Sequence, residues 1–159
     1  MITGPNLLVA MVAPVLFNRW SKELTTNTLF PILRNIAIGS IIIQLAGSLL
    51  WPVAKPLVPV ILGDRFSEYV PAMTLLVLSF FAVLSTRAMT PAFQGIGKNN
   101  WVTYSCTARF VSILASLALF LNMPSSFNIL ESSAWSWVIG EYAALITLAE
   151  GARRAAVVE

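Results

Sequence analysis

The chain has few of the side chains that most often do chemistry in proteins. It contains no histidine, a single cysteine (Cys106) and a single aspartate (Asp64) among 159 residues. Without histidine it lacks the commonest general base and the commonest metal ligand. One cysteine forms neither a disulfide within the chain nor a cysteine metal site. We therefore expect no catalytic residue, no metal site, no cofactor and no enzymatic activity.

Charge is also scarce. Only 11% of the residues are charged, whereas soluble domains carry about 25%. The formal net charge of +3 is not gathered on a basic face, which argues against a nucleic-acid partner. Hydrophobic residues make up 57% of the chain, and the mean hydropathy is +0.79. The composition predicts an all-α polytopic transmembrane helix bundle whose surroundings are a lipid bilayer.

Near-continuous apolar runs divide the chain into five expected membrane segments, which form one transmembrane domain over residues 1–159. The first, residues 5–17, is shorter than the roughly 20 residues that a spanning helix needs. It is either an interfacial segment or the end of a spanning helix whose beginning is missing. The other four are long enough to span a bilayer: residues 34–60, 69–95, 101–122 and 134–151.

Lysine and arginine flank these segments unevenly. Two of them, Lys55 and Arg65, lie on one side, and six lie on the other: Arg19, Lys22, Arg34, Lys98, Arg153 and Arg154. Because cytoplasmic loops carry an excess of Lys and Arg, we expect the richer side to face the cytoplasm. The C-terminus is then cytoplasmic.

Two glycine-containing brackets enclose the long apolar stretch of residues 62–98. The first reads Leu62-Gly63-Asp64-Arg65-Phe66-Ser67-Glu68-Tyr69, and the second reads Gln94-Gly95-Ile96-Gly97-Lys98. With the first bracket outside and the second in the cytoplasm, the stretch resembles the C-terminal half of bacterial polysaccharide flippases. These belong to the multidrug/oligosaccharidyl-lipid/polysaccharide exporter superfamily. The matching residues are Leu62, Gly63, Phe66, Tyr69, Ala72, Gln94, Gly95, Gly97 and Lys98.

The resemblance implies a function and a location. Such flippases move polyprenyl-diphosphate-linked oligosaccharide across the bacterial cytoplasmic (inner) membrane for polysaccharide and lipopolysaccharide biosynthesis in the cell envelope. They work by alternating access between two six-helix lobes. This chain resembles most of one lobe, so we expect it to be an incomplete C-terminal portion whose partner is the missing N-terminal lobe. Two alternatives stay open: a multidrug or cation antiporter of the same superfamily, and a structural membrane subunit that transports nothing.

Two arginines lie within the expected spans. Arg87 is about eight residues before the end of its segment, and Arg109 about eight after the start of the next, which places both roughly 12 Å inside the cytoplasmic boundary. If both face one side, their guanidinium groups suit a diphosphate, and the resemblance makes them substrate-binding candidates. The alternative is that each arginine extends to the headgroups or forms a structural ion pair.

Three further residues have open roles. Glu141, the acidic group well inside a span, is a candidate counter-ion for one arginine, a candidate coupling-ion or proton site, or a residue near the surface. Pro91 is either a hinge or a passive kink. Gln44 is expected to be an interhelical hydrogen-bond partner rather than a ligand.

Overall fold

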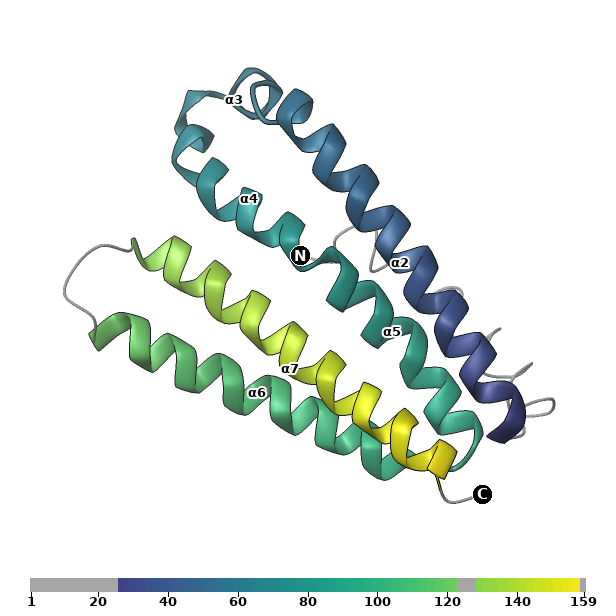
Figure 1. Ribbon diagram of the computed structural model, residues 1–159. Coiled ribbons are helices and arrows are strands. Elements are labelled where there is room, and N and C mark those ends of the chain that lie inside the picture. Colours follow the sequence, from purple (N-terminus) through teal and green to yellow (C-terminus); the bar gives the residue numbers. More distant parts are fainter. Residues whose placement is uncertain (1–25, 123–127, 158–159) are drawn as a thin grey trace.

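The computed structural model describes residues 26–122 and 128–157, and every regular element in these ranges is a helix. The predicted all-α class is therefore confirmed for this part of the chain. The elements are α2 (Thr26–Ala54), α3 (Leu57–Leu62), η1 (Asp64–Tyr69), α4 (Val70–Leu78), α5 (Phe80–Gly95), α6 (Asn99–Asn122) and α7 (Ile129–Val157) (Figure 1). The expected first segment, residues 5–17, lies outside the described residues.

The long helices run up and down in turn. Helix α2 runs one way, α4 and α5 return, α6 runs back, and α7 returns between α6 and the α4–α5 segment (Figure 1). Helix α7 packs against α6, α4 and α5, while α2 packs against α5 and α4. Helices α5 and α7 therefore form the middle of the bundle, and α2 and α6 flank it.

Two of the predicted spans are broken. The segment expected over residues 34–60 ends as α2 at Ala54, and α3 begins only at Leu57. Pro56 lies in this break, where its ring removes a backbone donor and favours the end of a helix. The segment expected over residues 69–95 divides into α4 and α5 at Ser79, with a bend of 48°.

Length and composition mark two described helices as able to cross a membrane, Pro31–Ala54 and Asn99–Asn122. The bent pair of α4 and α5, with η1, counts as a third if it forms one span. Helix α7 is long but less apolar, because it carries Glu141 along with several serine and tryptophan residues. The structure supports membrane association but does not confirm the predicted count of five segments.

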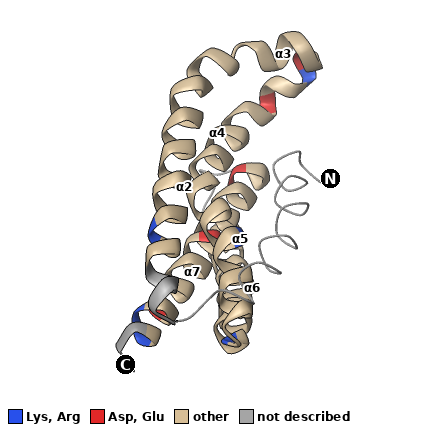
Figure 2. Cartoon of the chain, turned by 90° about the vertical axis from the view of Figure 1, so that its right-hand side faces the viewer, with Lys and Arg blue, Asp and Glu red and all other residues tan. Residues whose placement is uncertain are grey.

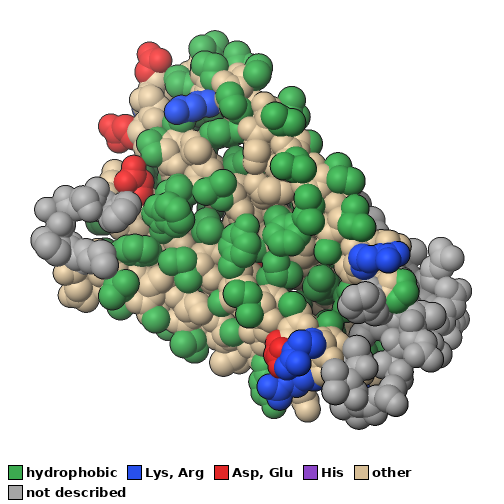
Figure 3. All heavy atoms as spheres, in the orientation of Figure 1, with side chains coloured by type: hydrophobic (Ala, Val, Ile, Leu, Met, Phe, Trp, Pro, Cys, Tyr) green, Lys and Arg blue, Asp and Glu red, His purple; other side chains and the backbone are tan. Residues whose placement is uncertain are grey.

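Many large apolar side chains lie on the surface of the bundle, outside its small hydrophobic core. The two most apolar spans, in α2 and α6, are also largely exposed. Figure 3 shows apolar side chains spread over the middle of one face and charged groups near its ends. Several small polar side chains are instead buried between helices: Ser40, Ser79, Ser85, Thr86, Ser105, Ser116, Ser132 and Ser136. Lipid makes this arrangement favourable, because an apolar surface costs nothing there and small residues allow close helix packing.

The turn at Gly97 has the geometry that its sequence predicts. The N–H of Lys98 donates to the carbonyl oxygen of Phe93 at 2.9 Å, and that of Gly97 donates to Gln94 at 3.0 Å. Together these bonds form a Schellman motif, which needs a left-handed residue at the position of Gly97. Its φ of 73° meets this need, and α6 begins directly afterwards at Asn99.

Candidate functional site

The close contact between α6 and α7 positions the charged residues of the bundle. Gly140 of α7 has no side chain, and a Cβ atom there would lie 3.1 Å from the backbone oxygen of Arg109 and would overlap Ile113. Gly151 similarly faces the ring of Trp101, at 2.6 Å from such an atom. The two helices therefore approach closely at two levels, and the first level is that of Arg109.

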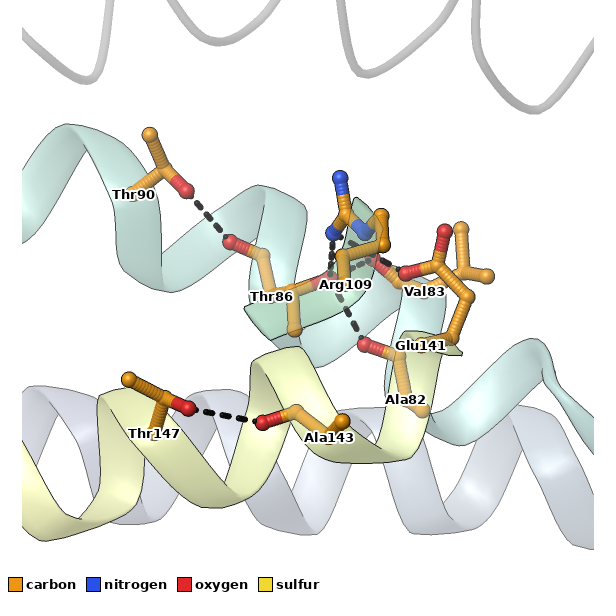
Figure 4. A network of polar contacts seen from close by, with 8 residues as sticks. All are labelled: Ala82, Val83, Thr86, Thr90, Arg109, Glu141, Ala143 and Thr147. Carbon is orange, nitrogen blue, oxygen red and sulfur yellow. Dashed lines mark hydrogen bonds and ion pairs between the residues drawn. The ribbon is translucent and has the colours of Figure 1, made fainter. Parts of the chain in front are cut away.

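Glu141 and Arg109 form an ion pair across this contact. Arg109 Nη2 lies 3.0 Å from Glu141 Oε2 (Figure 4). The glutamate side chain is fully buried, and the arginine side chain is 21% exposed. The interpretation of Glu141 as the counter-ion of one arginine agrees with this geometry.

Thr86 of α5 completes the contact. Its hydroxyl accepts a hydrogen bond from Arg109 Nη2 at 3.4 Å and donates within its own helix to the carbonyl oxygens of Ala82 and Val83 (Figure 4). Arg109 is thus held between α5 and α7. Thr86 was not among the predicted site residues, although it directly precedes Arg87, which was predicted.

The ion pair is close but poorly satisfied. Arg109 Nη2 and Glu141 Oε2 are at ion-pair distance. Among the described residues, however, no hydrogen bond with good geometry reaches three atoms of the pair: Glu141 Oε1, Glu141 Oε2 and Arg109 Nε. Ser85 Oγ, on the residue directly before Thr86 in α5, is also buried without a partner among the described residues. Buried polar groups normally find such partners. The site therefore has unused capacity for hydrogen bonding.

Arg87 belongs to the same level of the bundle. It follows Thr86 directly in α5, and it lies near enough to Glu141 to interact with it electrostatically. Its side chain is exposed, whereas that of Arg109 is mostly covered. The matching depth of the two arginines stays a prediction. Arg87, Arg109 and Glu141 together carry one net positive charge.

Pro91 lies apart from the bend in its segment. It is buried within the continuous helix α5, while the bend occurs at Ser79. The hinge role assigned to Pro91 stays a prediction. A shallow depression of about 400 Å³ lies at the turn between α5 and α6 and includes neither arginine; its lining residues are Gln94, Asn99, Val102 and Thr103.

A second group of polar contacts surrounds the bend. Gln44 of α2 accepts a hydrogen bond from the N–H of Phe81 at 2.9 Å, and Tyr142 of α7 donates to the carbonyl oxygen of Leu78 at 3.1 Å. The prediction of Gln44 as an interhelical partner is confirmed. Tyr142 was missed, because nothing in the sequence near it indicates a distant backbone partner.

Charges divide between the two ends of the bundle. Among the residues that the structure describes, the end that holds the α5–α6 turn carries Glu150 and four cations: Arg34, Lys98, Arg153 and Arg154. The opposite end carries two cations, Lys55 and Arg65, and three acidic residues: Asp64, Glu68 and Glu131. Figure 2 shows this separation along the long axis. The two ends that the sequence assigns to opposite sides of the membrane are thus opposite in the fold.

The described residues hold no group of three or more His, Cys, Asp or Glu side chains that could bind a metal ion. Comparison with known proteins adds no assignment: no protein-family model, curated protein or solved structure matches the chain. Only the geometry of the site therefore indicates its chemical role. One ion pair, Arg109–Glu141, lies between the helices of an apolar bundle, and the exposed Arg87 near it gives the three groups an excess positive charge.

Proposed function

We propose that this chain is one lobe of a membrane transporter of the flippase type, which moves polyprenyl-diphosphate-linked oligosaccharide by alternating access. The single observation that carries the proposal is the Arg109–Glu141 ion pair between the helices, with the exposed Arg87 near it. Ionisable groups at membrane depth are costly, and a functional role is the default hypothesis for them. An excess of one guanidinium group favours an anionic ligand over a cation.

The two arginines have different parts in this proposal. Arg109 is bound to Glu141 and Thr86, so its position is fixed before any ligand arrives. Arg87 is exposed, so its guanidinium group is open to an incoming diphosphate. A second lobe packed beside α5 would enclose the space in front of Arg87. The proposal also includes the location: a bacterial inner membrane, with the basic end and the C-terminus in the cytoplasm.

The experiment measures export of lipid-linked sugar by the full-length transporter, read as surface polysaccharide in cells that lack the native gene. We expect Arg87→Ala to abolish most export at unchanged membrane abundance. Arg34→Ala is the matched control, because Arg34 is an exposed arginine of α2 outside the cluster. Wild-type export by Arg87→Ala would contradict the proposal.

A paired substitution separates binding from charge balance at Arg109. If Arg109 serves only to neutralise Glu141, then Arg109→Gln combined with Glu141→Gln should export normally. If Arg109 also contacts the diphosphate, the combined variant should export poorly even when it is stably inserted. Glu141→Gln alone gives the baseline for the effect of removing the carboxylate charge.

A further inference from the structure

The break between α4 and α5 has hydrogen-bond partners from two different helices. The N–H of Phe81 would donate to Val77 in a continuous helix but donates to Gln44 of α2 at 2.9 Å. The carbonyl oxygen of Leu78 would accept from Ala82 in a continuous helix but accepts from the hydroxyl of Tyr142 at 3.1 Å. Each side chain therefore replaces an intrahelical bond.

Gln44 is oriented for this contact by its neighbours. Its Nε2 atom donates to Ser48 Oγ at 3.1 Å, which leaves Oε1 directed at the backbone of α5. Gly47 makes room beside it, because a Cβ atom at Gly47 would lie 3.3 Å from the ring of Phe80. The face of α2 formed by Gln44, Gly47 and Ser48 thus fits the broken region.

Ser79 stabilises the bent geometry locally. Its hydroxyl donates to the carbonyl oxygen of Leu76 at 2.7 Å, and its N–H donates to the same oxygen at 3.1 Å. Serine bonds of this kind often bend helices. The bend of 48° occurs without proline or glycine at the break, so nothing in the covalent chain makes it permanent.

We propose that the α4–α5 break is a hinge with two bonded states. In the bent state, Gln44 and Tyr142 hold the freed backbone groups. In the straighter state, Phe81 and Leu78 bond within a continuous helix and release both side chains. Phe81 N–H and the Leu78 carbonyl oxygen thus have a partner in either state, which lowers the penalty for bending inside a bilayer.

The position of the hinge suits a moving lobe. Tyr142 directly follows Glu141 in α7. The same helix therefore contributes the carboxylate of the ion pair and the hydroxyl that donates to the Leu78 carbonyl oxygen. A shift of α7 along its axis would act on both contacts. Hydrogen bonds alone support the hinge, whatever molecule the chain transports.

The test measures the distance between two spin labels by pulsed electron paramagnetic resonance, on the full chain in lipid nanodiscs. The labels replace exposed Glu68 and Gln94, one in each half of the bent segment, after Cys106→Ser removes the natural thiol. Straightening a bend of 48° would lengthen their separation by roughly 3 Å at 1.5 Å per helical residue. Labels at Thr103 and Leu119 of the unbroken helix α6 form the control pair.

Two variants each remove one of the side-chain hydrogen bonds that hold the bent state. We expect Tyr142→Phe and Gln44→Met each to move part of the population to the longer distance, with the control pair unchanged. Hydrogen exchange at the Phe81 amide should stay slow in Gln44→Met, because the amide regains a partner within the helix. A rigid kink predicts the reverse, with an unchanged distance and faster exchange at Phe81. That result would overturn the hinge whether or not the chain transports sugar.

Discussion

Gly140 of α7 lies against the backbone of Arg109 in α6, so that even a methyl group at Gly140 would be 3.1 Å from the Arg109 carbonyl oxygen. This contact brings the next residue, Glu141, within ion-pair distance of the Arg109 side chain. The lack of a side chain at Gly140 therefore allows the side chains of Arg109 and Glu141 to form their ion pair. Close helix approach through small residues is the main way in which helices associate in lipid.

Gly140→Ala should separate α6 from α7 and destabilise the bundle. Overpacking of this kind costs about 1–3 kcal/mol, since Ile113 and the backbone of Arg109 both have to move. The measurement is the midpoint of unfolding in detergent. Gly39→Ala is the matched control, because a Cβ at Gly39 meets nothing within 4 Å; it should gain roughly 0.5–1 kcal/mol from helix propensity. Equal stability of the two variants would contradict the close contact.

Glu141→Gln should leave Arg109 without its counter-ion inside the bundle. We expect a loss of about 3 kcal/mol, the low end for a buried pair, because the arginine is partly exposed. Combining Glu141→Gln with Arg109→Gln should recover part of this loss, as a double-mutant cycle in the same unfolding assay would reveal. Additive losses would mean that the two side chains do not interact.

Gly97→Ala should weaken the turn between α5 and α6. A side chain in the left-handed region costs about 1–2 kcal/mol, and the φ of Gly97 is 73°. Gly97→Asn should lose less, because asparagine tolerates this conformation. Thermal unfolding of the three proteins in one detergent gives the comparison. The turn geometry would be wrong if alanine proved at least as stable as asparagine.

Labelling of introduced cysteines tests the orientation of the bundle. In a Cys106→Ser background, Glu68→Cys should react with a membrane-impermeant maleimide in intact cells, because η1 is expected outside the cytoplasm. Asn100→Cys, at the basic end, should react only after the membrane is opened. Both positions are exposed in the structure, so burial does not explain a difference. The reverse pattern would invert the proposed topology.

Much of the fold could be predicted from local features of the sequence. Apolar runs located the helices, and the Gly97 turn, the proline-rich end of α2 and the division of charges follow from residues close together in the chain. The break at Ser79 could not be predicted in this way. It has no proline or glycine, and its partners Gln44 and Tyr142 are distant in sequence.

The charged residues of the candidate site stand out in the sequence, but their pairing does not. Hydropathy alone marks Arg87, Arg109 and Glu141, because charged side chains stand out in apolar helices. Which arginine pairs with Glu141 depends on the close approach at Gly140 and on the rotation of α6 against α7. Hydropathy carries no information about that rotation. The sequence therefore indicates the depth of the charges but not their pairing.

The buried serines and the exposed leucines suggest how substitutions would be tolerated along this chain. On the outward faces of α2 and α6, one apolar residue should replace another freely, whatever its shape, because fluid acyl chains adapt to it. Between the helices, size should matter more than polarity, so that alanine replaces Ser136 or Ser85 more readily than leucine does. A library scored for membrane insertion would then show its strictest positions where the side chains are smallest.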